Sequence, residues 1–133
     1  MSELTEHTIA AVADRYAAAW ISRDPEAIMA LHAPDSTFQA HGSGAAVRGK
    51  SALFKEFADI FERFPNFGVE TRRLLLGDKH WTLDWTLTFQ PAGKERRGFH
   101  ALDVVEVDDA GLITRKDTFF DYAELKAAMG SGK

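Results

Sequence analysis

The spacing of apolar residues changes near the middle of the chain, and this change constrains the fold more than any other feature. In the first half, apolar residues recur at helical spacing, as in the series from Ile9 to Trp20. In the second half they alternate with polar residues, as in Trp81–Phe89, which is the pattern of a half-buried strand. Short turns rich in Gly, Pro and Asp separate such segments, so we expect an antiparallel meander. The expected strands are 68–76, 79–90, 95–107 and 112–120.

Helices are expected on both sides of the meander, three before it and one after it. The later three begin at residues whose side chains can cap a helix, and they end at Pro or Gly. A short strand over 36–41 follows the second helix, and residues 1–133 are expected to form one α+β domain with a loose tail at 130–133. The boundary residues are Asp24, Pro25 and Pro34 for the second helix, Ser51 and Pro65 for the third, and Asp121 and Gly130 for the fourth.

Composition argues against several classes of function. The chain has 133 residues, a net charge of −4 and no cysteine. The negative charge gives no electrostatic support for nucleic-acid binding, and the lack of thiols excludes disulfides and zinc–sulfur sites. No apolar run approaches the ~20 residues of a membrane helix, and the acidic N-terminus lacks the basic region of a signal peptide. We therefore expect a cytoplasmic protein, and because no histidines have metal-ligand spacing, neither a metal nor another cofactor.

Residues 44–51 match the phosphate-loop pattern G-x-x-x-x-G-K-[ST], but their context argues against nucleotide binding. A phosphate loop follows a buried parallel strand, whose sequence is a continuous apolar run. The preceding segment 37–41 is not such a run, and the chain lacks alternating strand–helix units. We therefore interpret the match as a turn before a capped helix.

One carboxylate lies in the middle of an apolar strand. Asp103 shares its face of the expected strand with Phe99, Ala101, Val105 and Val107, so it is expected to point into the interior. A buried carboxyl without a partner is costly, so such a group either pairs with a cation or becomes protonated. Either state is useful in a pocket, as a base or as a hydrogen-bond donor. The alternative is an Asp at a sheet bulge, bonded to the backbone.

The last expected strand does not reveal which of its faces is inward. One set of alternate residues contains Lys116 and Thr118, and the other contains Asp117. If the first set faces inward, Lys116 can pair with Asp103 and hold it ionised, as a base rather than a donor. If the second set faces inward, Asp117 joins the pocket. A solvated edge strand fits the pattern equally well.

Tyr16 and three histidines are the other candidates for chemistry. Tyr16 lies on the inward stripe of the first helix, and its hydroxyl either reaches the surface or lies beside Asp103 in one cavity. His32 is expected to end the second helix near Tyr16, and His41 to end the first strand. His100 is expected to face away from Asp103. Each histidine fits a structural or exposed role better than a catalytic one.

Several short motifs follow one another in an order that is specific when taken together. They are Arg15-Tyr16, 24–28, 36–41, 47–49, 102–107, 111–113 and 119–121. In order and spacing these motifs resemble the NTF2-like proteins, in particular the SnoaL-like and ketosteroid isomerase branches, over about residues 8 to 129. The resemblance implies a cone in which a curved antiparallel sheet wraps N-terminal helices around an apolar pocket. It also implies a homodimer, and the Thr-rich sheet face is the expected interface.

The resemblance assigns roles to particular residues. Ketosteroid isomerases use a Tyr and a protonated Asp as an oxyanion hole, together with an Asp as general base. Tyr16 and Asp103 correspond to the two oxyanion-hole donors. His41 or Asp117 are candidates for the remaining proton transfer, which makes these four residues the expected catalytic set.

The chain also departs from the family pattern. Ala40 occupies the position of the general base and cannot accept a proton, and Phe57 stands where a supporting Tyr is typical. Thr118 aligns with an acidic residue that SnoaL-like cyclases use on their last strand. Trp85 and Leu87 occupy the positions of the Arg–Asp pair of epoxide hydrolases, so that activity is not expected.

Two classes of function fit these observations. The first is an enzyme that binds an apolar ligand and performs acid/base isomerisation or cyclisation on a polycyclic or polyketide-like carbonyl compound. The alternative is a non-catalytic module that binds a small molecule or a protein. The expected ligand-binding residues are Trp20, His32, Phe38, Phe57, Phe61, Trp85, Phe99, Lys116, Thr118 and Phe120.

Overall fold

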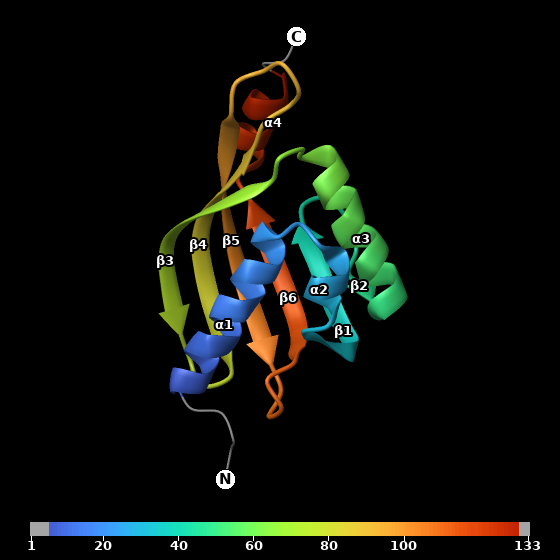
Figure 1. Ribbon diagram of the computed structural model, residues 1–133, viewed down its shortest axis with the longest axis vertical. Coiled ribbons are helices and arrows are strands. Elements are labelled where there is room, and N and C mark those ends of the chain that lie inside the picture. The colour runs from blue at the N-terminus through green and yellow to red at the C-terminus, as the bar shows by residue number, and fades with distance from the viewer. Residues whose placement is uncertain (1–5, 131–133) are drawn as a thin grey trace.

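The computed structural model describes residues 6–130, and it shows a curved six-stranded sheet with helices packed against it (Figure 1). The strand order is β2-β1-β6-β5-β4-β3. The predictions for residues 1–5 and for residues 131–133 of the tail lie outside the described residues, and Gly130, predicted to begin the tail, is the last residue of α4. The elements are α1 (Glu6–Ile21), α2 (Pro25–Met29), β1 (His32–His41), β2 (Val47–Arg48), α3 (Lys50–Arg63), β3 (Gly68–Leu76), β4 (His80–Phe89), β5 (Arg97–Val107), β6 (Ile113–Phe120) and α4 (Tyr122–Gly130).

The predicted meander is confirmed. Strands β3, β4, β5 and β6 pair in sequence order, and each pair is antiparallel. Strand β1 then adds beside β6 in the parallel direction, with Phe38 opposite Lys116 and Ala40 opposite Thr118. The α+β class is therefore confirmed, with one parallel junction that brings the first strand of the chain next to the last.

The second helix is shorter than predicted. It begins as expected, since the Asp24 carboxylate accepts a hydrogen bond from the Glu26 backbone N–H at 3.0 Å. It ends at Met29 and not at Pro34, so the expectation that His32 ends this helix is wrong. Instead, β1 begins at His32. Its pairing with β6 is interrupted between His32 and Thr37, and proline is tolerated in such an interruption because no ladder hydrogen bond is needed there.

The third helix begins one residue earlier than its expected cap. Gly49 is the N-cap residue, with φ 93°, a conformation that glycine adopts readily, so the prediction that Ser51 caps the helix is wrong. Upstream of it, β2 pairs antiparallel with β1. Residues 44–51 contain β2 and follow β1, which is parallel to β6 but buried only at His32, Ser36 and Phe38, so it is not the continuous buried apolar strand that a phosphate loop follows. Asp121 caps α4 as predicted, through a hydrogen bond from the Glu124 backbone N–H.

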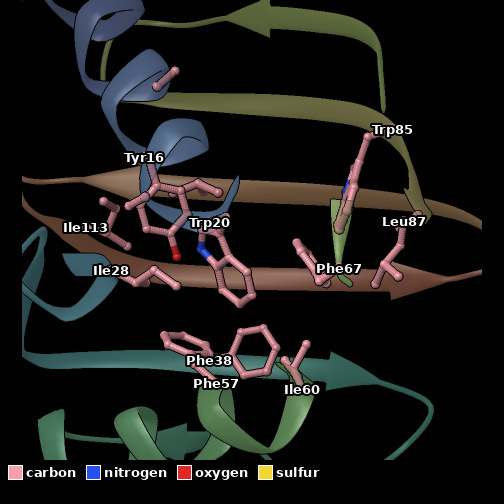
Figure 2. Packing of buried hydrophobic residues seen from close by; sticks show 14 of the residues in the cluster. Tyr16, Trp20, Ile28, Phe38, Phe57, Ile60, Phe67, Trp85, Leu87 and Ile113 are labelled. Carbon is pink, nitrogen blue, oxygen red and sulfur yellow. The ribbon is translucent and has the colours of Figure 1, made fainter. Parts of the chain in front are cut away.

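The helices divide the concave face of the sheet between them. Helix α1 lies across β3 and β4, and α3 lies along β1 and β2 (Figure 1). Aromatic side chains from both helices meet those of the strands in the space between, where Trp20 and Phe57 are 5.0 Å apart (Figure 2). No helix within residues 6–130 is long and apolar enough to cross a membrane.

Candidate functional site

A cavity of about 540 Å³ lies between α1 and the concave face of β3 and β4. On the helix side its wall is built largely of alanines, which do not reach the sheet and so leave the space open. On the sheet side the wall is formed by larger, mostly apolar residues. The helix contributes Ala10, Ala11, Ala13 and Ala17, and the two strands contribute Val69, Thr71, Leu74, Trp81, Leu83 and Trp85.

Asp103 and Lys116 meet at the inner wall of this cavity, in agreement with the first of the two arrangements considered for β6. Both side chains are almost completely buried, with 6% and 4% of their surface exposed. Lys116 Nζ is 3.7 Å from Asp103 Oδ2, and Thr118 Oγ1 donates a 2.8 Å hydrogen bond to Asp103 Oδ1. The β5–β6 register is regular at Asp103, so the alternative of an Asp at a bulge is wrong.

Aromatic rings surround the Lys116 ammonium. Its nitrogen lies 4.0 Å from the ring centre of Trp20 and 5.0 Å from that of Tyr16. The rings of Phe38 and Phe57 are both at 5.9 Å. Burial lowers the pKa of Lys116 below its ordinary value, and the nearby Asp103 offsets part of this effect. The aromatic faces favour positive charge, whereas the lack of water disfavours it.

Tyr16 begins a short chain of buried hydrogen bonds. Its hydroxyl is 2.8 Å from His32 Nε2, and His32 Nδ1 is 3.0 Å from Ser36 Oγ. Burial, assisted by the charge of Lys116, lowers the pKa of His32 to about 3, so the imidazole is neutral near neutral pH. Burial also raises the pKa of Tyr16, which keeps it a phenol. A neutral imidazole has one donor and one acceptor nitrogen, so the tautomer of His32 decides whether the Tyr16 proton points to His32 or is free for the cavity.

Two indole N–H groups of the cavity wall have no partner. Trp20 Nε1 and Trp85 Nε1 are buried and make no hydrogen bond of standard geometry within the part of the chain that the structure describes, although the Trp20 indole lies close enough to the Tyr16 hydroxyl to lower the pKa of that group. Buried donors without acceptors are rare in folded proteins and destabilising. Both residues line the cavity, but each indole nitrogen is covered by protein atoms, so a bound molecule meets the rings rather than the N–H groups.

The structure brings five of the predicted site residues together around the cavity: Tyr16, Trp20, Trp85, Asp103 and Lys116. The other predicted ligand-binding residues do not line it. The aromatic ones pack against other rings, as in the contacts of Phe99 with Phe120 at 5.4 Å and of Phe38 with Phe57 at 5.2 Å, and Thr118 bonds to Asp103. These other residues are His32, Phe38, Phe57, Phe61, Phe99, Thr118 and Phe120.

His41 and Asp117 were predicted to belong to the catalytic set with Tyr16 and Asp103. They lie on the opposite face of the sheet, and so they do not line the cavity. Asp117 and Lys116 are neighbours on β6 and therefore point to opposite sides. Asp117 bonds to His41 Nε2 at 2.7 Å and to Arg115 Nε at 2.8 Å. Although burial opposes it, these two partners lower the pKa of Asp117 below its ordinary value.

His100 also lies on the outer face, as predicted, where its Nε2 is 2.6 Å from Asp84 Oδ1. No group of His, Asp and Glu side chains within residues 6–130 could hold a metal ion. The homodimer through this outer face stays a prediction.

Sequence reasoning missed the alanine wall of α1 and the residues of β3 that face it. A signal was available, because Ala10, Ala13 and Ala17 recur at helical spacing opposite strands rich in large side chains. Small residues facing large ones can either let the helix approach closely or leave a space. The sequence alone does not distinguish these two outcomes.

Comparison with known proteins places these features in a family. Residues 13–116 match the family model of the SnoaL-like domain. No curated protein matches the chain. Among solved structures, the epoxide hydrolase/cyclase-like enzyme SalBIII, which has a role in pyran ring formation in the polyether salinomycin, superimposes with a TM-score of 0.79 at 16% identity, covering 90% of this chain and 95% of that chain.

Two further structures have similar folds. One is a protein of ketosteroid isomerase-like fold from Catenulispora acidiphila in complex with trimethylamine, with a TM-score of 0.78 at 20% identity over 90% of this chain and 92% of that chain. The other is a predicted SnoaL-like polyketide cyclase from Shewanella denitrificans, with a TM-score of 0.77 at 13% identity over 92% of this chain and 96% of that chain. At these identities the likeness shows the fold, which is the cone expected from the sequence.

Proposed function

The chain belongs to the SnoaL-like domain family, and from this premise we propose that it binds an apolar carbonyl compound in the cavity beneath α1 and isomerises or cyclises it by acid/base chemistry. A polycyclic or polyketide-like compound fits the largely apolar walls. The structures of similar fold include a predicted SnoaL-like polyketide cyclase and a protein of ketosteroid isomerase-like fold, which supports this class of ligand.

The observation that carries the proposal is the position of Asp103. Its carboxylate lies in the wall of a largely apolar cavity beside an ammonium group, and both side chains are nearly fully buried. A carboxylate paired with Lys116 is a proton acceptor, whereas a protonated carboxyl would be a donor. We therefore assign Asp103 the role of base, in place of the residue that Ala40 cannot supply.

The reaction begins when Asp103 takes a proton from the carbon next to the carbonyl group. Negative charge then develops on the carbonyl oxygen, which needs hydrogen-bond donors that are already in place. The candidate donor is the Tyr16 hydroxyl, in the His32 tautomer that leaves its proton free. Return of the proton from Asp103 to a different carbon completes an isomerisation.

The test of catalysis is proton exchange at carbon. The ketone 2-tetralone, dissolved in D₂O with the protein, loses its signals for the hydrogens next to the carbonyl as they are replaced by deuterium, and NMR measures the rate. Asp103→Asn is expected to lower the protein-dependent rate by about a hundredfold or more. Asp117→Asn is the matched control, because it removes a carboxylate from the other face of the sheet. Equal rates for wild type and Asp103→Asn would exclude Asp103 as the base.

The test of the binding site uses two alanines of one helix. Ala17 faces the cavity, whereas the next residue, Ala18, is exposed. Ala17→Leu fills part of the space and is expected to weaken 2-tetralone binding about tenfold or more, while Ala18→Leu leaves it unchanged. Calorimetric titration measures both, and loss of affinity in neither variant would place the ligand elsewhere.

A second candidate function is binding without catalysis. Its support is that Ala40 occupies the usual position of the base and that the Tyr16 hydroxyl already has a partner in His32. Saturable binding of 2-tetralone that Ala17→Leu weakens, with no protein-dependent exchange in wild type, would favour this alternative.

A further inference from the structure

We propose that Lys116 is a nucleophile, and that it forms an imine with the carbonyl carbon of an aldehyde or ketone bound in the cavity while Asp103 carries the protons. This inference rests on the proposed function only in taking a carbonyl compound as the ligand. It assigns Lys116 a covalent role in addition to its pairing with Asp103.

Geometry is the first argument. The Lys116 side chain is 4% exposed and lines the cavity, so a bound molecule lies against this side chain. The separation of 3.7 Å from Asp103 Oδ2 is longer than the usual N–H···O⁻ hydrogen bond. An amine that has no short hydrogen bond to Asp103 can turn its lone pair toward a ligand.

The charge state is the second argument. An amine attacks a carbonyl carbon only when it is neutral, and desolvation shifts a buried lysine in that direction. The titratable groups that face Lys116 are Asp103 from β5, Tyr16 from α1 and His32 from β1. Tyr16 and His32 are both neutral near neutral pH, so Asp103 is the charged partner in this group and the natural acceptor of the Lys116 proton.

The steps balance without any further reactant. Lys116 transfers a proton from Nζ to Asp103, and the neutral amine attacks the carbonyl carbon. A proton moves from nitrogen to the former carbonyl oxygen and gives a carbinolamine. Asp103 then returns its proton to the hydroxyl group, which leaves as water while the nitrogen lone pair forms the C=N bond. The products are a protonated imine on Lys116, one water molecule and the Asp103 carboxylate.

The surroundings suit the product as well as the reactant. The positive charge stays on the same nitrogen, where the aromatic faces of Trp20 and Tyr16 stabilise it. A protonated imine withdraws electrons from the adjacent carbon more strongly than a neutral carbonyl group does. The restored Asp103 carboxylate lies beside the imine and can remove a proton from the carbon next to the C=N bond. Covalent attachment thereby makes the neighbouring carbon of the ligand more acidic. This compensates for the base that the family usually has at the position of Ala40.

The experiment traps the imine on wild-type protein, so it needs no variant that folds differently. The protein is incubated at about pH 7 with 2-naphthaldehyde and cyanoborohydride, which reduces an imine to a stable amine, and peptide mass mapping locates the adduct. Exposed lysines are almost fully protonated at this pH, since their pKa is about 10.4. Lys116 is expected to be modified at least about tenfold faster than Lys126, an exposed lysine of α4.

Competition and matched variants sharpen the result. Naphthalene has the shape of the probe without its carbonyl group, and it is expected to slow modification of Lys116 but not of Lys126. Lys116→Met is expected to lose the fast adduct, whereas Lys126→Met retains it. Modification of Lys116 no faster than that of Lys126, or equal protection of both by naphthalene, would overturn the proposal.

The outcome separates this inference from the proposed function. Exchange of 2-tetralone hydrogens that depends on Asp103, without a fast adduct at Lys116, would support the base and reject the imine. A fast adduct at Lys116 without exchange would support the imine and reject the isomerase.

Discussion

Two ion pairs on neighbouring residues of β6 differ in almost every respect except their chemistry. On the inner face, Lys116 and Asp103 are 3.7 Å apart and nearly fully buried. On the outer face, Arg115 and Asp117 are 2.8 Å apart, and the Arg115 side chain is 56% exposed. The outer pair has the better geometry, yet the inner pair lies at the cavity. Burial of both charged side chains, rather than a short distance between charges, distinguishes the candidate site.

The two ion pairs differ in how strongly solvent weakens the attraction between their charges. Water and dissolved ions reach the outer pair through the exposed Arg115 side chain and screen its attraction to the more buried Asp117 carboxylate. The inner pair keeps its full electrostatic effect but also retains the cost of removing two charges from water. A pair of this kind is weak evidence for a stabilising role and is better explained by what its charges do to a ligand.

The largest expected effect comes from breaking the inner pair. Asp103→Asn leaves Lys116 buried without a counter-charge, and we expect the free energy of unfolding to fall by about 3 kcal/mol. Asp117→Asn is expected to lower it much less, because water replaces the lost partner of Arg115. Urea denaturation at neutral pH measures both variants, and equal losses would remove the distinction between the two faces.

A double variant tests whether the inner pair exists for stability. Replacing both members by apolar residues, as in Asp103→Leu with Lys116→Met, removes the desolvation cost together with the attraction. We expect this variant to be more stable than Asp103→Asn and close to wild type, while catalysis is lost. If it is as unstable as Asp103→Asn, the pair is needed for folding and the argument for a functional role weakens.

The next largest effect is a dependence of stability on pH that comes from His32. Its pKa is about 3 in the folded protein, against an ordinary value of 6.5. As pH falls below about 6.5 the unfolded chain therefore takes up a proton that the folded protein does not, and stability is lost. Between about pH 7.5 and about pH 5 the free energy of unfolding should drop by about 2 kcal/mol.

A variant that cannot titrate is the control for this prediction. His32→Gln should show a shallower dependence over the same range. The carboxylates of Asp84 and Asp117, whose pKa values are lowered from 3.8, contribute only at more acidic pH. An unchanged slope in His32→Gln would mean that other groups cause the effect.

The sequence predicted most of the fold because the signals were local. Strict alternation along β4 and short turns on both sides of it define a meander whatever the rest of the chain does. The early end of α2 was not predictable, because Pro34 lies in β1 only where the β1–β6 ladder is interrupted. That interruption depends on a partner strand about eighty residues away, which no local pattern reports.

The candidate site was predicted in part for the same reason. Asp103 lies among apolar neighbours on its own strand, so its direction could be inferred. Lys116 and Asp117 could not be separated, because both faces of β6 carry a charge and each charge finds its partner on another element. The cavity was missed because it arises from the small size of side chains, and a missing volume leaves no pattern of its own.

A smaller loss of stability is expected when either of two tyrosines is replaced by phenylalanine. Tyr16→Phe removes the partner of His32 Nε2 in the interior, and we expect a loss of about 1–2 kcal/mol. Tyr122→Phe removes a 2.7 Å hydrogen bond to the His41 carbonyl oxygen at the outer surface, where water can take its place. Thermal unfolding should show a clear decrease in Tm for the first variant and a much smaller one for the second. The reverse order would contradict the assignment of the dry and wet sides of the sheet.

The smallest expected effect concerns salt, and it tests the comparison most directly. Raising the ionic strength from about 0.1 M to about 1 M shortens the screening length from about 10 Å to about 3 Å. The modest loss of stability caused by Asp117→Asn should shrink further, because salt already weakens the attraction between Asp117 and Arg115 in wild type. The loss caused by Asp103→Asn should stay the same, since ions do not enter the space between Asp103 and Lys116. If added salt reduces both losses in proportion, solvent reaches the inner pair, and the cavity cannot provide the dry surroundings on which the chemistry of Lys116 depends.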